Sequence, residues 1–299
     1  MTLPKREALN LAAHNLLRRT AQRLHLDVVR ADFNSPIVDT RALPTELWDR
    51  PAALHGLELD LERQMELIEG ELRQFIDELR LPVSPPAPGE SFRLHLDNPW
   101  YGPMDAHLLY AFVRRNRPRR ILELGSGFST LFIEHALAAD RSAGRGGHVV
   151  VDPYPSPLVN TVQPAVKLHR CSAAEAPQGL FSELGAGDVL FVDTSHTIRP
   201  GGEVVRLVLE VLPLLAPGVL VHFHDIFVPF AYPRVFYERY NVHWQEQYLL
   251  QAFLAYNPNF TVLCSNHALW RLQRERLRGL FPGLRDGMQP GGFWFVRDA

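Results

Sequence analysis

The segment from Arg120 to Thr130, RILELGSGFST, constrains the fold of this chain more than any other stretch. Its apolar run at 121–124 predicts a buried strand, and the segment 129–139 predicts an amphipathic helix. A Gly-Ser-Gly turn at 125–127 joins the two. Such a unit directs free backbone N–H groups at a ligand beside the helix N-terminus, and its glycines let that ligand approach the backbone. The segment therefore predicts a cofactor-binding unit, with an ordinary loop as the alternative.

Beyond residue 90 the sequence alternates between apolar strand-like runs and amphipathic helical segments. Strands are predicted at 121–124, 148–151, 166–169, 189–192, 219–223, 260–264 and 293–296, and helices at 105–116, 129–139, 202–215 and 244–256. A basic helical stretch is also predicted from about 268 to 280. This alternation predicts an α/β fold with a seven-stranded, mostly parallel, doubly wound sheet. In such sheets ligands bind beyond the carboxyl ends of the strands.

The first 80 residues have a different pattern, which predicts two helices, at 5–25 and 57–79. The proline-rich segment 81–89, LPVSPPAPG, cannot continue a helix and is typical of a stiff linker. We therefore expect a helical N-terminal extension with its linker at 1–90, followed by the cofactor-binding domain at 91–299.

The composition narrows the class of protein. With 46% hydrophobic residues and a net charge of −2, the chain has ample core material and no strong field for nucleic acid or anionic membranes. It contains neither an apolar run of membrane-spanning length nor the hydrophobic region of a signal peptide near its start. We expect a soluble cytoplasmic protein that binds no nucleic acid and no membrane, with a homo-oligomer as an open alternative.

Two details of the glycine turn identify its cofactor class. Thr130 stands where the dinucleotide fingerprint Gly-x-Gly-x-x-Gly requires its third glycine, and Glu123 precedes the turn by two positions. These residues resemble motif I of the class I S-adenosylmethionine (SAM) methyltransferases, a Glu/Asp-x-Gly-x-Gly turn. The resemblance implies SAM as the cofactor, with its methionine half beside the turn. The residues that it implies here are Glu123, Gly125, Ser126, Gly127 and Ser129.

Two further residues are candidates for the adenosine half of the cofactor. Asp152 ends the second predicted strand, 25 positions after Gly127, and an acidic residue placed in this way can accept hydrogen bonds from ribose hydroxyls. The alternative is an ordinary turn at the end of the strand. Ser172 follows the third strand, where the resemblance implies contact with adenine.

Polar residues also gather where the fourth and fifth predicted strands end. Asp193 and His196 follow the fourth strand, and Asp225 ends the fifth. The pattern resembles the cation-dependent branch of class I O-methyltransferases, the catechol and macrolide-sugar type. The resemblance implies that Asp193 and Asp225 hold a divalent metal and that His196 is the general base, in a position often taken by lysine. The chain departs from the pattern at Ile226, where catechol-type enzymes usually have asparagine.

The identity of the metal is not determined by this pattern. The fifth strand, VLVHFHD, carries His222 and His224 on one face. A site built only for Mg²⁺ would need no imidazole, so Mn²⁺ and Zn²⁺ are alternatives to Mg²⁺, and His224 is a third candidate ligand beside Asp193 and Asp225. A metal-free hydrogen-bond cluster is the other interpretation, and His196 could instead cap the following segment.

The predicted function is SAM-dependent methylation of a small-molecule hydroxyl, on a sugar or natural product, with His196 and Asp193 as catalytic residues. An NAD-dependent oxidoreductase and a non-catalytic cofactor-binding or assembly protein are the rivals. The segment DNPWY at 97–101 resembles the Asn-Pro-Pro-Tyr motif of amino-methylating DNA enzymes, but its second proline is missing. Nucleic-acid methylation is therefore disfavoured.

Overall fold

The computed structural model describes residues 5–29, 33–139 and 147–298. The chain forms two compact units, one of residues 1–47 with 234–243 and one of residues 48–233 with 244–299. The smaller unit contains α1 (Lys5–Gln22), the 3₁₀ turn η1 (Thr40–Ala42) and α8 (Arg234–Glu238). The larger unit contains the sheet and every site discussed below.

The larger unit is built on a seven-stranded sheet with the order β3-β2-β1-β4-β5-β7-β6. Its strands are β1 (Arg120–Leu124), β2 (Gly147–Val151), β3 (Val166–His169), β4 (Val189–Val192), β5 (Leu220–Phe223), β6 (Phe260–Ser265) and β7 (Phe293–Arg297). Neighbouring strands from β3 to β5 are parallel, and β7 is antiparallel to both β5 and β6. The predicted seven-stranded, mostly parallel sheet is confirmed, with each predicted strand within one residue of the observed bounds.

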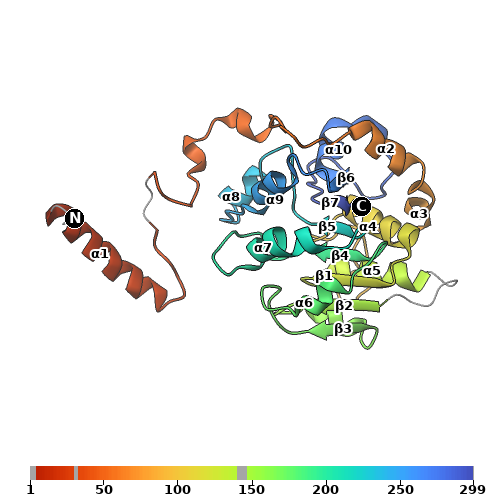
Figure 1. The fold of residues 1–299 in the computed structure, drawn as a ribbon, viewed down its shortest axis with the longest axis horizontal. Helices are drawn as coiled ribbons and strands as arrows, with labels where there is room; N and C mark the ends of the chain where they lie inside the picture. The colour runs from red at the N-terminus through yellow and green to blue at the C-terminus, as the bar shows by residue number, and fades with distance from the viewer. Residues whose placement is uncertain (1–4, 30–32, 140–146, 299) are drawn as a thin grey trace. The chain divides into compact units, whose positions relative to one another are not determined.

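Helices cover both faces of the sheet, which explains why its central strands are apolar throughout (Figure 1). One core contains side chains of α2 (Leu61–Glu69), α3 (Arg73–Glu78), α4 (Pro103–Asn116), α5 (Phe128–Ala139), α10 (Asn266–Leu272) and α11 (Arg274–Leu277). The other contains those of α6 (Gln178–Ser182), the π turn η4 (Leu207–Val211) and α9 (Glu246–Leu254). The four residues of β4 and of β5 are all buried between these layers.

The N-terminal helices of the larger unit are part of its core. Met65 and Ile68 on α2 and Ile76 on α3 are buried in the same core as α4 and α5. The boundary predicted near residue 90 therefore falls inside this unit, because these helices bury their apolar stripes against the domain. The predicted helix 57–79 is divided at Gly70, whose N–H bonds the Glu66 carbonyl 2.9 Å away and ends α2.

Other helical predictions differ in detail. The predicted helix 202–215 consists of α7 (Glu203–Arg206), η4 and the 3₁₀ turn η5 (Leu212–Leu214). Pro213 lacks the N–H that an α-helix requires, so the segment tightens there. Among the described residues, no helix is both long and apolar enough to cross a bilayer.

Candidate cofactor and catalytic site

The site lies at the switch point of the sheet, where the chain leaves β1 toward β2 on one side and β4 occupies the other. The N–H of Asp193, just after β4, donates to the Leu124 carbonyl at 2.9 Å. Gly125 has a φ of +91°, and a Cβ at this position would overlap the Asp193 carbonyl oxygen. The turn after β1 thus requires glycine because two strand ends meet there.

A cavity of about 740 Å³ opens at this switch point. Its walls include Gly125, Ser126, Asp152 and Ser172, four residues predicted to bind the cofactor. The Asp152 carboxylate accepts hydrogen bonds from Ser126 Oγ at 2.6 Å and from the Tyr154 N–H at 2.8 Å. A carboxylate has about four lone-pair positions, so Asp152 retains capacity for the hydroxyls of a ribose. The volume, the glycine turn and this carboxylate fit an adenosyl cofactor.

Two of the predicted cofactor residues belong to a buried cluster behind the turn. Glu123 is fully buried and lines neither cavity described here; its carboxylate accepts from Ser129 Oγ at 2.6 Å and lies 3.0 Å from His148 Nε2. His148 Nδ1 lies 2.9 Å from Glu134. Burial would lower the pKa of His148, but Glu123 and Glu134 outweigh it and raise that pKa. We call Glu123, Ser129, Glu134 and His148 the His148 cluster.

A second cavity, of about 490 Å³, continues from the glycine turn toward the ends of β4 and β5. Gly127 and Ser129 line it on one side, and Asp193, His196, His224 and Asp225 line it on the other. It shares Ser126, Asp193 and Thr194 with the first cavity. The remaining walls are largely apolar: Trp100, Tyr101, Phe128, Leu158 and Trp244. The two cavities therefore meet at Asp193.

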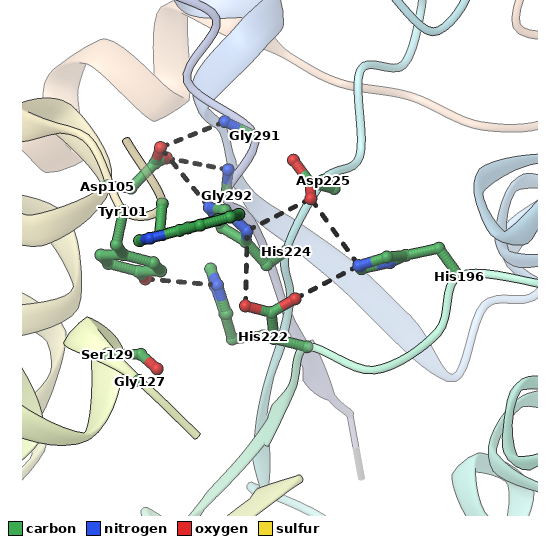
Figure 2. Close-up of polar contacts among 12 residues, drawn as sticks. Tyr101, Asp105, Gly127, Ser129, His196, His222, His224, Asp225, Gly291 and Gly292 are labelled. Atoms are coloured by element: carbon green, nitrogen blue, oxygen red, sulfur yellow. Dashed lines mark hydrogen bonds and ion pairs between the residues drawn. The ribbon is translucent and has the colours of Figure 1, made fainter. Parts of the chain in front are cut away.

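His196 links three carboxylates at the floor of the second cavity, and Figure 2 shows its contact with one of them, Asp225. Its Nε2 is 3.2 Å from Asp193 Oδ1 and 3.6 Å from Asp225 Oδ2, and its Nδ1 is 2.7 Å from Glu246 Oε2 on α9. One ligand atom from each of Asp193, His196 and Asp225 lies within 4.8 Å of the other two. With His224 and Asp105, described next, these residues form what we call the strand-edge cluster.

His224 stands on the other side of the same carboxylates. Its Nδ1 is 3.7 Å from both Asp193 Oδ2 and Asp225 Oδ2, and its Nε2 is 3.7 Å from Asp105 Oδ2 on α4. The ring stacks on Tyr101, with centroids 4.7 Å apart. The structure therefore brings all three predicted metal ligands, Asp193, His224 and Asp225, to one point.

The electrostatics of the strand-edge cluster are those of buried opposite charges. Burial opposes the charged imidazoles, but the carboxylates raise the pKa of His196 well above its ordinary value and that of His224 to about 9. The carboxylates therefore favour the protonated form of both rings. Burial, together with the neighbouring carboxylates, raises the pKa of Asp225 and of Glu246.

The backbone at two of these residues is unusual. His196 has a φ of +55° and Asp225 a φ of +57°, in the left-handed region that most residues avoid. Asp225 also packs against Gly291, where a Cβ would come within 2.9 Å of the Asp225 Cα. Strained positions of this kind concentrate at functional sites, and here they turn two strand ends toward one cavity.

His222 does not take part in this cluster, although it shares a strand face with His224. It is fully buried, stacked on Phe191 at 4.5 Å, and its Nε2 lies 3.4 Å from the Tyr101 hydroxyl. Burial, and then the charge of His224, lower the pKa of His222 well below its ordinary value. His222 is thus a neutral core residue.

Sequence reasoning missed Glu246 as a partner of His196 and Asp105 as a partner of His224. Asp105 lies in α4 and Glu246 begins α9, and both are distant in the sequence from their histidine partners. Their local sequence patterns do not indicate contact with the strand ends. A signal was available in their burial: an acidic residue in an apolar helical stretch needs a partner inside the protein.

Two sequence details that bear on rival functions have structural explanations. The Gly127 N–H donates to Thr130 Oγ1 at 3.0 Å, so this amide is not free for a pyrophosphate. Asn98 uses its side chain locally, accepting from the Tyr101 N–H at 2.7 Å and donating to the Tyr101 carbonyl at 2.8 Å. The segment 97–101 is therefore a turn that presents Trp100 and Tyr101 to the second cavity.

A comparison with protein families agrees with this geometry. Residues 122–226, which run from β1 to just beyond β5, match the family model described as a methyltransferase domain. The match covers less than half of the chain, and this matched part carries the glycine turn and the ends of β4 and β5. Over this segment the chain resembles a methyltransferase domain. No curated protein matches the chain.

The chain also has a low-identity likeness to solved structures. The SAH-bound methyltransferase PaMTH1 of Podospora anserina is 19% identical, with a TM-score of 0.42 over 65% of this chain and 78% of its own. An SAH complex of an O-methyltransferase from Bacillus cereus is 15% identical, with a TM-score of 0.41 over 79% and 90% of the two chains. A Klebsiella pneumoniae protein described as a putative O-methyltransferase is 14% identical, with a TM-score of 0.40 over 80% and 90%.

Proposed function

We propose that the protein transfers the methyl group of SAM to a hydroxyl of a small molecule, such as a sugar or natural product. The observation that carries the proposal is the meeting of two cavities at Asp193, one with the features of a cofactor site and one floored by His196 and Asp225. When bound, SAM supplies an electrophilic methyl group on a sulfonium. The chain must then hold an acceptor oxygen in line with that methyl and receive its proton.

The cofactor site follows from the walls of the larger cavity. Asp152 receives the ribose hydroxyls, and Ser172 lies beside the adenine. Gly125, Ser126 and Gly127 form the side of the methionine half. Ser129 borders the second cavity and fixes Glu123 by its hydrogen bond, so Glu123 supports the turn through Ser129.

The acceptor site follows from the second cavity. Trp100, Phe128 and Trp244 offer flat apolar surfaces, which suit a sugar or aromatic ring. No lysine or arginine is among the described residues that line this cavity. The acceptor that fits is therefore neutral rather than a phosphate or carboxylate.

His196 is the proposed general base. Glu246 holds its Nδ1, which leaves Nε2 directed at the cavity and the two aspartates. The proton that the carboxylates keep on His196 must first be released, since an imidazolium cannot accept another. A cation bound by Asp193 and Asp225 would neutralise their negative charge, and it would lower the pKa of a hydroxyl held near it. Asp193 and Asp225 would then no longer favour the charged form of His196.

The donor set fits a divalent cation. Asp193 and Asp225 contribute two carboxylates that share a cavity wall, and the buried imidazole of His224 turns its Nδ1 toward an oxygen of each at 3.7 Å. These are the residue types that bind divalent metals in proteins.

The test is calorimetric titration of the full chain with SAM and with NADH, followed by a screen of hydroxylated metabolites for release of S-adenosylhomocysteine. We expect SAM to bind and NADH not to bind, with product formed from at least one neutral hydroxylated acceptor. Binding of NADH without SAM would support the oxidoreductase, and SAM binding with no transfer to any acceptor class would favour a non-catalytic protein.

A further inference from the structure

Asp105 is held behind His224 by three groups from two other parts of the chain (Figure 2). Its Oδ1 accepts from the Gly292 N–H at 2.8 Å and from Asn266 Nδ2 at 2.7 Å, and its Oδ2 accepts from the Gly291 N–H at 3.2 Å. Asp105 is only 2% exposed. A Cβ at Gly292 would lie 2.9 Å from Asp105 Oδ1, so glycine is needed for this approach.

His224 is fixed between this carboxylate and the two strand-end aspartates. It is 5% exposed, its ring lies flat against Tyr101, and its Nε2 faces Asp105 while its Nδ1 faces Asp193 and Asp225. The contact between Nε2 and Asp105 Oδ2, at 3.7 Å, is at ion-pair distance and is longer than a hydrogen bond. An imidazole that turns one nitrogen to a buried carboxylate and the other to acidic oxygens is the arrangement of a metal-bound histidine with its supporting carboxylate.

The charges of the cluster leave room for a divalent cation. Four carboxylates, Asp105, Asp193, Asp225 and Glu246, surround His196 and His224, and among the described residues no arginine or lysine forms an ion pair with them. The acidic side chains of the cluster thus outnumber its imidazoles by four to two. Buried charges require compensation, and a divalent ion would supply it.

The distances also suit a metal that prefers imidazole. Two ligand atoms bonded to a tetrahedral Zn²⁺ at about 2.0–2.1 Å are roughly 3.3–3.4 Å apart. His224 Nδ1 is 3.7 Å from an oxygen of each aspartate, a few tenths of an ångström more than the separation expected for two bound ligand atoms, roughly 3.3–3.4 Å. Mg²⁺ prefers oxygen ligands throughout, and imidazole favours metals of the Zn²⁺ type.

We propose that Asp193, Asp225 and His224 bind a borderline divalent cation such as Zn²⁺ or Co²⁺ in preference to Mg²⁺, and that Asp105 is the positioning residue that orients His224 toward it. The proposal rests on the proposed function only for the location of the site. It names the class of cation and assigns Asp105, which the sequence pattern did not indicate.

The experiment uses the full chain, stripped with a chelator and titrated with Co²⁺ while its visible absorption is recorded, and with Zn²⁺ and Mg²⁺ by calorimetry. We expect one Co²⁺ per chain, with the spectrum of a nitrogen-ligated ion, and binding at least about 100-fold tighter than that of Mg²⁺. Asp105→Asn should weaken Co²⁺ binding about 10- to 100-fold. His224→Ala should weaken it further and remove the preference over Mg²⁺.

His55→Ala, at an exposed histidine of the same unit, is the matched control and should leave Co²⁺ binding unchanged. Circular dichroism and thermal unfolding show whether each variant is folded, and Asp105→Asn provides the test if His224→Ala is not. Equal affinity for Mg²⁺ and Co²⁺, or Co²⁺ binding that persists in both site variants, would overturn the inference. Methyl transfer by a protein that binds no cation would overturn it while leaving the proposed function intact, whereas failure of SAM to bind would refute that function alone.

Discussion

The His148 cluster and the strand-edge cluster both consist of histidine and acidic side chains, but they differ in their surroundings. Each places an imidazole between carboxylates that raise its pKa. In the His148 cluster, Glu123, Glu134 and Ser129 close around the ring, and His148 lines neither described cavity. In the strand-edge cluster, Asp193 remains 31% exposed and Asp225 20% exposed, both on a cavity wall.

The difference indicates how to separate a stabilising cluster from a functional one. In a closed network the polar groups bind only one another, so breaking the network should lower the free energy of unfolding. An open one keeps oxygens and ring nitrogens directed at a space that a ligand can enter. Raised pKa values alone do not make this distinction, because both clusters have them.

The largest expected effect is that of His196→Gln on catalysis. Glutamine cannot accept a proton from a hydroxyl, so the methyl-transfer rate should fall about 100- to 10,000-fold, as expected for loss of a general base. SAM affinity should change little, because His196 does not line the cofactor cavity. The measurement is the initial rate of S-adenosylhomocysteine release, with calorimetry for SAM. A rate within threefold of the wild-type rate would make His196 a structural residue.

His148→Gln should have the opposite profile. Glutamine cannot bridge Glu123 and Glu134 with two charged hydrogen bonds, and breaking a buried ion pair of this kind costs about 3 kcal/mol or more. The free energy of unfolding from urea denaturation should fall by that amount, while the folded fraction retains most of its methyl-transfer rate. Loss of activity without loss of stability would place this cluster in the catalytic machinery.

Asp152→Asn tests the cofactor cavity without changing either histidine cluster. Weaker hydrogen bonds to the ribose should reduce SAM affinity about 10-fold, since a hydrogen bond to a charged group contributes about 1.5–3 kcal/mol. Ser172→Ala is the milder companion, with a smaller expected change. Calorimetry measures both, and unchanged SAM affinity in Asp152→Asn would mean that the ribose does not lie at the end of β2.

The smallest expected effect is on the pH dependence of stability. The folded pKa of His148 is raised above its unfolded value of about 6.5. Its contribution is therefore complete below about pH 6.5 and is lost as the pH rises through the folded pKa. The difference in unfolding free energy between wild type and His148→Gln should be greatest near pH 5.5 and should shrink at alkaline pH. A difference that grows with pH would contradict a charged His148.

The sequence was sufficient for the sheet and for the residues that follow its strands. Short apolar runs such as VLFV at 189–192, placed between helical segments, predict buried strands, and parallel strands bring their carboxyl ends to one edge, so Asp193 and Asp225 were expected to meet. The sequence placed Glu123 next to the glycine turn but did not predict that its side chain is buried away from the cavity. Its partner His148 comes from a different strand, so the local sequence does not indicate the contact. The pairing of Glu246 with His196 depends on how α9 packs, which no local pattern specifies.

The alternation of side chains along a strand also does not show which residue on a face is functional. His222 and His224 are equivalent in the period-two pattern, yet Phe191 and Trp294 enclose His222 and leave only His224 at the cavity. Which of two equivalent positions becomes functional is decided by side chains from neighbouring strands.

The hydrogen bonds from Gly291 and Gly292 to Asp105 give the site an order of assembly. These glycines precede β7, the last strand of the chain, whereas Asp105, Asp193 and Asp225 are all translated well before them. A nascent chain can pair β1 through β5 and still lack the donors that hold Asp105 in place. Asp105 is therefore held in place only after β7 and the two glycines before it have docked beside β5.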